Sequence, residues 1–218
     1  LEGILPSVNG YISPYRLRLG TELEAGDFNG DGLCDLISTA STGAEIPEYS
    51  GQSGILFFFH GDEVDGLNSD PFAYWTMYDE DYIDSTSQSN GLFGSSLAVG
   101  DINGDGALDL AVGDQFWGDS SVTILSSVSM VSTTYVEEVP EPNWMVNGPS
   151  WSEFGVSADI YDLDADGLDD LLVGSTRKND GEMRIFLGSQ INANWGIGHE
   201  ADDTDHDIYA GGYNNDED

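Results

Sequence analysis

Oxygen-bearing side chains recur at positions 1, 3, 5 and 9 of a nine-residue segment that occurs three times in this chain. They are Asp27, Asn29, Asp31 and Asp35 in the first copy, Asp101, Asn103, Asp105 and Asp109 in the second, and Asp162, Asp164, Asp166 and Asp170 in the third. Position 6 is always glycine, which lets a backbone turn tightly around an ion. Carboxylate and amide oxygens are the ligands that Ca²⁺ takes in proteins. The repeated spacing therefore predicts about three bound Ca²⁺ ions, one for each loop.

The residues around these loops exclude an EF-hand. An EF-hand loop ends on a bidentate Glu at position 12 and lies between two helices, whereas position 12 here is Ser38, Val112 or Val173. The flanking segments, such as 96–100 and 110–113, are short, apolar and bounded by glycine, which is typical of strands. We therefore expect each loop to connect two strands of a β-hairpin.

In such a hairpin, the Asp at position 9 would close the cage from the start of the returning strand. The backbone carbonyl at position 7 is expected to add one further ligand in each loop. These carbonyls belong to Leu33, Ala107 and Leu168.

The repeat extends well beyond the loops. An apolar-Gly pair beginning at Leu19, Phe93 or Phe154 lies eight residues upstream of each loop, since 27 − 19, 101 − 93 and 162 − 154 are each 8. Downstream, each copy has an aliphatic strand candidate and then a strand candidate around a tryptophan. The former are 54–61, 121–125 and 182–188, and the latter are 72–77, 143–146 and 192–195, with Trp75, Trp144 and Trp195 expected to pack between neighbouring sheets.

Four strands in each copy, at periods of 74 and 61 residues (101 − 27 and 162 − 101), are typical of β-propeller blades. The predicted fold is all-β, with three four-stranded blades at 19–77, 93–147 and 154–195. Residues 1–18 form an outer or donated strand, 78–92 an acidic Ser-rich insertion, and 196–218 a degenerate fourth repeat or an acidic tail. Three blades leave sheet edges open, so we expect a partial propeller or one completed by assembly.

Composition narrows the function classes. The 218 residues carry 5 Lys and Arg against 41 Asp and Glu, a formal net charge of −36. This charge repels nucleic acid and suits a saline or Ca²⁺-rich exterior. A single cysteine, Cys34, excludes an internal disulfide framework and is predicted to be a small apolar filler. Apolar runs are too short for a membrane span. The chain has neither an initiator Met nor a signal peptide, as expected of a mature or excised segment.

The sequence contains no catalytic constellation. His60, His199 and His206 are few and scattered, and the sequence lacks a Gly-x-Ser-x-Gly segment, a phosphate loop and a Cys-based motif. Acidic pairs are expected by chance at this composition. We therefore predict that the chain is not an enzyme, with a Ca²⁺-using carbohydrate-active domain as the weaker alternative.

The repeat resembles the FG-GAP repeat of integrin α-subunit propellers and of many bacterial surface proteins. The Phe-Gly pair, the Asp-x-Asn/Asp-x-Asp-Gly-x-x-Asp loop and the following apolar-Gly strand match in order and spacing over about residues 19–195. The departures are Leu19 in place of Phe and Ala165 in place of a loop Gly. The resemblance implies a Ca²⁺-braced propeller that works outside the cell in adhesion or assembly. Its partner would be a protein or glycan at the cell surface, or copies of itself in a surface fibre or layer.

Overall fold

A computed structural model describes residues 19–45, 52–61, 73–76, 92–115, 120–126, 142–149, 151–177, 181–196, 199–202, 205 and 207–211. The N-terminal segment 1–18, most of the insertion 78–92 and His206 lie outside these residues. Within the described part, no helix has the length and apolar character needed to cross a bilayer.

The described elements are almost all strands. In chain order they are β1 (Leu23–Gly26), β2 (Asp35–Glu45), β3 (Gln52–Phe59), β4 (Ala73–Thr76), β5 (Phe93–Gly100), β6 (Asp109–Asp114), β7 (Ser121–Leu125), β8 (Trp144–Asn147), β9 (Ser157–Tyr161), β10 (Asp170–Ser175), β11 (Glu182–Phe186), helix α2 (Gly188–Ala193), β12 (His199–Asp202) and β13 (Ile208–Gly211).

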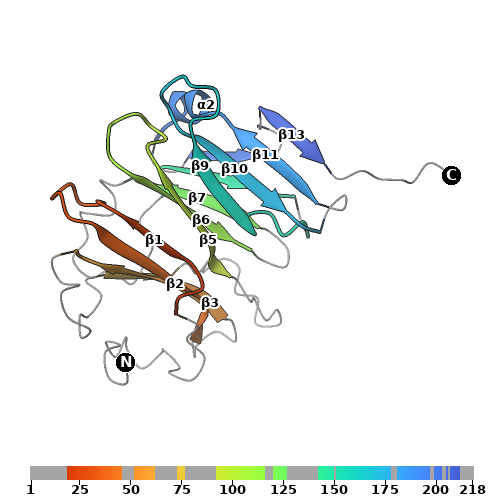
Figure 1. Ribbon diagram of the computed structural model, residues 1–218. Helices are drawn as coiled ribbons and strands as arrows, with labels where there is room; N and C mark the ends of the chain where they lie inside the picture. The colour runs from red at the N-terminus through yellow and green to blue at the C-terminus, as the bar shows by residue number, and fades with distance from the viewer. Residues whose placement is uncertain are drawn as a thin grey trace.

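These strands form three sheets, which we call blades 1, 2 and 3. Their strand orders are β1-β2-β3-β4, β12-β8-β7-β6-β5 and β13-β11-β10-β9. Neighbours pair antiparallel, except that β12 runs parallel to β8. Figure 1 shows the blades following one another, with the loops that join β1 to β2, β5 to β6 and β9 to β10 on the same side. The all-β fold of propeller-type blades is confirmed.

Blade 3 differs from the sequence prediction in its last strand. Residues 192–195 were expected to form a strand around Trp195, and this is wrong, because Gly188–Ala193 forms helix α2. Gly188 and Ile191 are buried on this helix and Trp195 packs partly buried against the same core. These positions are spaced i, i+3 and i+7, the period of a helix and not of a strand.

The outer strand of blade 3 is instead β13, which pairs with β11 in a register that aligns Ile208 with Ile185. Tyr209 Oη donates a hydrogen bond to Glu182 Oε2 at 3.2 Å, and Arg184 forms an ion pair with Glu182 at 2.8 Å. Likewise β12 adds a fifth strand to blade 2. The described part of 196–218 thus extends blades 2 and 3, and forms no further sheet of its own.

Two apolar cores lie between the blades. Phe28, Ile37, Leu56 and Phe58 of blade 1 meet Phe93, Leu97, Leu110, Val112 and Leu125 of blade 2. Ala98, Ala111, Val122, Ile124, Trp144 and Val146 of blade 2 meet Phe154, Ile160, Leu171, Val173 and Phe186 of blade 3. Blade 2 is therefore covered on both faces, which explains why its central strands are continuous apolar runs. The packing role predicted for tryptophan is confirmed at Trp144, whose ring meets that of Phe186 edge-on at 5.6 Å.

The Phe-Gly pair allows the blades to approach closely. Phe154 is fully buried between blades 2 and 3, and Gly155 follows with φ 77°, a conformation that favours glycine. Gly113 of blade 2 lies directly against it, since a Cβ on Gly113 would stand 2.2 Å from the carbonyl oxygen of Gly155. Ser96 Oγ donates to that same oxygen at 2.9 Å. Gly94, Gly113 and Gly155 are thus close-contact positions between neighbouring blades, whereas a Cβ on Gly20 of the first copy would have nothing within 4 Å among the described residues.

Replacing Phe154 with Ala is expected to lower the free energy of unfolding by about 3–5 kcal/mol, because the ring fills the core between blades 2 and 3. Tyr161→Ala is the control, since Tyr161 is 64% exposed on the opposite face of blade 3, and its effect should stay within about 0.5 kcal/mol. Urea denaturation of both variants measures the difference. Equal effects would contradict this assignment of the core.

Candidate metal centre

The three repeated loops lie where the sequence predicts, inside β-hairpins. Loop 1 (27–35), loop 2 (101–109) and loop 3 (162–170) connect β1 to β2, β5 to β6 and β9 to β10, and position 9 of each loop is the first residue of the returning strand.

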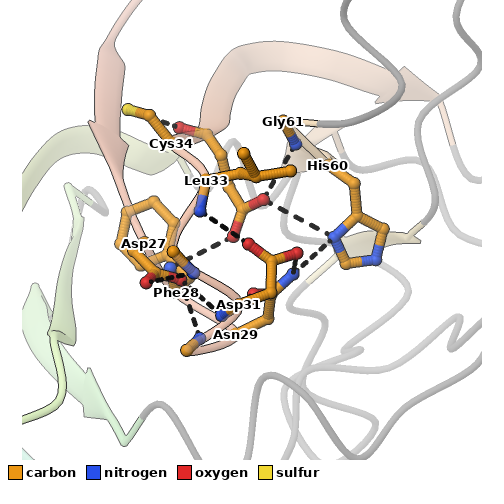
Figure 2. Close-up of polar contacts among 11 residues, drawn as sticks. Asp27, Phe28, Asn29, Asp31, Leu33, Cys34, His60 and Gly61 are labelled. Carbon is orange, nitrogen blue, oxygen red and sulfur yellow. Dashed lines mark hydrogen bonds and ion pairs between the residues drawn. The ribbon is translucent and has the colours of Figure 1, made fainter.

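In loop 1 the side chains fold back onto the backbone of the loop itself (Figure 2). Asp27 accepts hydrogen bonds from three backbone amides: Oδ1 from Gly30 at 2.7 Å and Asp31 at 3.1 Å, and Oδ2 from Gly32 at 2.9 Å. Asn29 Oδ1 accepts from the Asp31 amide at 2.8 Å, and Asp31 Oδ1 accepts from the Leu33 amide at 2.7 Å. The spacing therefore gathers the oxygens of positions 1, 3 and 5 around the same turn.

Loops 2 and 3 repeat this pattern. In loop 2, Asp101 accepts from the amides of Asp105 (3.0 Å) and Gly106 (2.9 Å), Asn103 from Asp105 (2.8 Å), and Asp105 from Ala107 (2.9 Å). In loop 3, Asp162 accepts from Gly167 (3.2 Å), Asp164 from Asp166 (3.0 Å), and Asp166 from Leu168 (2.8 Å). The three loops therefore share one local hydrogen-bond pattern, with Asn at position 3 of loops 1 and 2 and Asp at position 3 of loop 3.

Position 4 carries backbone strain in one copy. Gly30 and Gly104 have φ of 75° and 74°, and Ala165 takes the same left-handed conformation with φ 62°. A residue with a Cβ pays about 1–2 kcal/mol there. Ala165, which stands where the other two loops have glycine, therefore keeps the left-handed conformation and the shape of the loop.

The aspartates at position 9 anchor the loops to the sheets. Asp35, Asp109 and Asp170 are 3%, 0% and 0% exposed. Each accepts through Oδ2 from the amide at position 2 of its own loop, at 3.1, 3.2 and 2.9 Å. In loops 1 and 3 the Oδ1 atom accepts at 2.9 Å from a residue just beyond the next strand, Gly61 or Gly188. The loop is thereby tied to the third strand of its blade.

Gly61 and Gly188 were not singled out from the sequence. A Cβ on Gly61 would stand 2.5 Å from the carbonyl oxygen of Cys34, and one on Gly188 would stand 2.4 Å from that of Asp169. Only glycine lets the third strand come so near position 8 of the loop. A signal was present, because both glycines follow a strand-ending Phe by two residues.

Two further residues bear on loop 1. His60, just beyond β3, lies against the loop, with Nδ1 at 3.0 Å from Asn29 Nδ2 and 3.6 Å from Asp35 Oδ1 (Figure 2). Cys34, expected as an apolar filler, is exposed. The equivalent Leu108 and Asp169 contact the preceding blade, a contact that Cys34 does not have among the described residues.

Loop 3 meets the requirements of a cation site. One carboxylate oxygen from each of Asp162, Asp164 and Asp166 lies within 4.8 Å of the others. Asp162 Oδ1 is buried without a hydrogen-bond partner among the described residues. A buried, unpaired carboxylate oxygen is costly unless a cation compensates it. The donors are all oxygen, which suits a hard ion such as Ca²⁺ better than a thiol- or imidazole-preferring metal.

The residues predicted as ligands divide into two groups. Positions 1, 3 and 5 converge, and the structure brings three carboxylates together at loop 3. The carboxylates at position 9 are engaged with backbone amides, as described above, and the carbonyls of Leu33, Ala107 and Leu168 lie at position 7. Coordination of an ion by any of these positions stays a prediction.

Charge repulsion and burial act together on Asp109. The pKa of Asp109 is raised from 3.8 to about 7, mainly by burial and in addition by the carboxylates of Asp105 and Asp101, while hydrogen bonds from the Asn103 and Ile102 amides oppose the shift. Loop 2 without a cation therefore disfavours a charged Asp109.

The fold and the loops together define a β-propeller-type protein whose hairpin loops carry clustered oxygen side chains. The sequence model of the FG-GAP repeat matches residues 93–125, which hold β5, loop 2, β6 and β7. The chain belongs to the FG-GAP family of integrin-like repeats.

Similar proteins include both integrins and an enzyme. Integrin alpha-PS5 of Drosophila melanogaster is 31% identical over 165 residues, 72% of this chain and 15% of that protein. Integrin alpha-3 of Mus musculus is 32% identical over 105 residues, 47% of this chain and 10% of that protein. The phosphatidylinositol-glycan-specific phospholipase D of Mus musculus is 31% identical over 192 residues, 83% and 22% respectively. The chain thus spans less than a quarter of the length of these relatives.

The raised pKa of Asp109 predicts how the metal-free chain responds to pH. Between pH 3.8 and about 7 the folded chain holds this proton more tightly than the unfolded chain, so stability falls as pH rises through that window. Asp109→Asn, which stays neutral, should flatten the slope. Urea unfolding in a chelator, at half-unit pH steps, measures it. Identical slopes for the two proteins would show that Asp109 is not the titrating group.

Proposed function

We propose that this chain is an extracellular adhesion-type propeller module in which Ca²⁺ braces the hairpin loops of the blades. The observation that carries the proposal is the identical folding of the oxygens of positions 1, 3 and 5 in three loops. The unpaired, buried Asp162 Oδ1 adds to it, because it needs a positive partner.

The residues that would hold the ions are those at positions 1, 3, 5, 7 and 9 of each loop. Bound Ca²⁺ would supply positive charge that offsets the mutual repulsion of these carboxylates. Asp35 and Asp170 also bond the amides of Gly61 and Gly188. An ion in loop 1 or loop 3 would therefore stabilise both the hairpin and its attachment to the third strand.

The role is proposed to be non-catalytic. FG-GAP repeats occur in integrins and in a phospholipase D alike, and a fold shared by unrelated activities does not itself specify one. In all three loops of this chain the carboxylates serve backbone amides in the same way, which suits bracing. The integrin resemblance favours a partner at the cell surface, either a protein or a glycan, met through loops between the strands.

Ca²⁺ is expected to raise the thermal and urea stability of the chain, and Asp105→Ala should remove the part that loop 2 contributes. With Ca²⁺ at about 100 times the dissociation constant, that part is about 2.7 kcal/mol. Asp159→Ala is the charge-matched control, because Asp159 lies on β9 outside all loops, and it should keep the full gain. A Ca²⁺-independent melting curve for the unmodified chain would sink the proposal.

A second candidate function, a subunit that assembles with copies of itself, is favoured by the outer face of blade 3. Leu172, Met183 and Ile185 lie on this face, each 61 residues after its equivalent in blade 2. Those equivalents, Ala111, Val122 and Ile124, are the side chains by which blade 2 packs onto blade 3. Cross-strand pairing puts Leu172, Ile185 and Ile208 in one row. This face thus repeats the chemistry of an inter-blade interface.

That face is partly open in blade 3, where Ile185 is 7% exposed but several of its neighbours are accessible to solvent. Met183 and Ile208 are 39% and 51% exposed, and Leu163 at position 2 of loop 3 is 47% exposed. Its equivalents in loops 1 and 2, Phe28 and Ile102, are buried in the inter-blade cores. At the other end, Leu23 of β1 is 59% exposed, whereas the equivalent Leu97 is buried. Two complementary open faces allow head-to-tail association.

In sedimentation velocity with millimolar Ca²⁺, the chain is expected to form oligomers that grow with concentration. Met183→Glu should dissociate them, because it places a charge on the open face. Gln190→Glu adds the same charge on the exposed side of α2 and should leave the oligomers intact. A monomer at every concentration would rule out the homotypic subunit and leave the adhesion module.

A further inference from the structure

Asp169 joins loop 3 to loop 2 by two hydrogen bonds. The amide of Asp101 donates to Asp169 Oδ2 at 2.7 Å, and the amide of Asp169 donates to the carbonyl oxygen of Asp101 at 3.2 Å. Asp101 is position 1 of loop 2, and Asp169 directly precedes Asp170, position 9 of loop 3. Asp169 of loop 3 is thus hydrogen-bonded through both its side chain and its backbone to the backbone of position 1 of loop 2.

The packing around this double contact is tight. A Cβ on Gly100 would stand 2.7 Å from Asp169 Oδ2 and 2.2 Å from Ile160 Cγ2. Leu168, position 7 of loop 3, lies over loop 2 in the same way, since its Cδ2 atom would be 2.5 Å from a Cβ on Gly104. Loop 3 cannot shift at residues 168 and 169 without moving the backbone of loop 2.

Loops 1 and 2 meet differently. Position 8 of loop 2 is Leu108, whose side chain has no hydrogen-bond acceptor and packs against Gly26, with Cδ1 2.4 Å from the position of a Cβ there. At position 4 of loop 1, Gly30 has nothing within 4 Å of the corresponding point, unlike Gly104. Among the described residues, the contact between loops 1 and 2 is therefore apolar and non-directional. Unlike Asp169, the side chain of Leu108 cannot accept a hydrogen bond from the amide of Asp27.

We propose that Asp169 is a positioning residue that couples cation binding at loops 2 and 3, so that Ca²⁺ in one loop strengthens binding in the other while loop 1 binds independently. The proposal rests on the Ca²⁺ function proposed above. An ion in loop 3 orders the segment that ends in Asp170, and with it Asp169. Asp101 is then held before loop 2 binds, so the second ion has less backbone to order.

Charge acts in the same direction as ordering. The Asp169 carboxylate bonds the amide of Asp101, whose own carboxylate is the position 1 ligand of loop 2. A cation in loop 2 would bring positive charge to the loop whose first residue the Asp169 carboxylate contacts. The charge-assisted bond between Asp169 and the Asp101 amide is accordingly most favourable when both loops are loaded.

The glycine amides at position 6 allow each loop to be followed separately. Gly32, Gly106 and Gly167 each donate to the position 1 carboxylate of their own loop, so their ¹⁵N–¹H signals report binding at that loop. Titration of the labelled chain with Ca²⁺ gives three midpoints. Asp166→Ala, which disables loop 3, is expected to weaken binding at Gly106 by about 5-fold or more and to leave Gly32 unchanged.

Coupling between two sites is reciprocal, so the same titration can be repeated with loop 2 disabled in place of loop 3. Asp105→Ala, which disables loop 2, should weaken binding at Gly167 by the same factor that Asp166→Ala imposes at Gly106. In an Asp169→Leu background, which gives loop 3 the residue type of Leu108, each knockout should leave the other loop unaffected. Asp169→Asn keeps an acceptor oxygen and should retain part of the coupling. Asp159→Asn removes a charge from the same blade and should retain all of it.

The outcomes separate the coupling from the Ca²⁺ function itself. If all three glycines titrate but Asp166→Ala leaves Gly106 unchanged, or weakens Gly32 as much as Gly106, the coupling is overturned and the Ca²⁺ function stands. Coupling that survives Asp169→Leu overturns the role of Asp169. If no glycine responds to Ca²⁺, both proposals fall. Should Asp169→Leu not fold, the two loop knockouts, both at exposed positions, still decide whether loops 2 and 3 are coupled.

Discussion

Backbone amides that face the inside of a tight turn must be satisfied by side-chain oxygens, and the rest of this structure depends on that constraint. The side-chain oxygens at positions 1, 3 and 5 accept those amides, and in loop 3, where all three are carboxylates, they lie close enough together to repel one another. Position 9 extends the same chemistry outward, since Asp35 and Asp170 use their second oxygen to hold Gly61 and Gly188. In loops 1 and 3, the loop, the hairpin and the third strand are therefore one hydrogen-bonded unit.

A blade that is apolar on both faces can pack against a further blade on each side, and this allows the repeat to continue. Blade 2 buries one face against Leu56 and Phe58 of blade 1 and the other against Leu171 and Phe186 of blade 3. Each blade thus contacts its neighbours alone, as in other repeat proteins, and stability accumulates interface by interface. The same logic makes the end blades incomplete, which the exposure of Met183 and Ile208 shows directly.

Proteins with different functions can share this repeat if the contacts between their repeats differ. The chain shares its repeat with integrin alpha chains and with a phospholipase D, so activity must come from residues that the repeat leaves free. Position 8 of the loop is one of these. In the two loops that follow another described blade it is Leu108 or Asp169, and with it the contact to the preceding blade changes from apolar packing to a directional hydrogen bond.

The sequence by itself determined the loops, the hairpins and the order of strands within a blade, because these depend on residues close together in the chain. Oxygen side chains two residues apart, glycines at fixed positions and short apolar runs leave little choice of local structure. Tertiary structure decided the rest. Helix α2 replaces a strand because Ile191 and Trp195 find the core between blades 2 and 3, and β12 and β13 join sheets begun far upstream. The hydrogen bond between Asp169 and Asp101 joins residues 68 positions apart in the chain. Such contacts form only when the blades pack, because packing brings distant residues within hydrogen-bond distance.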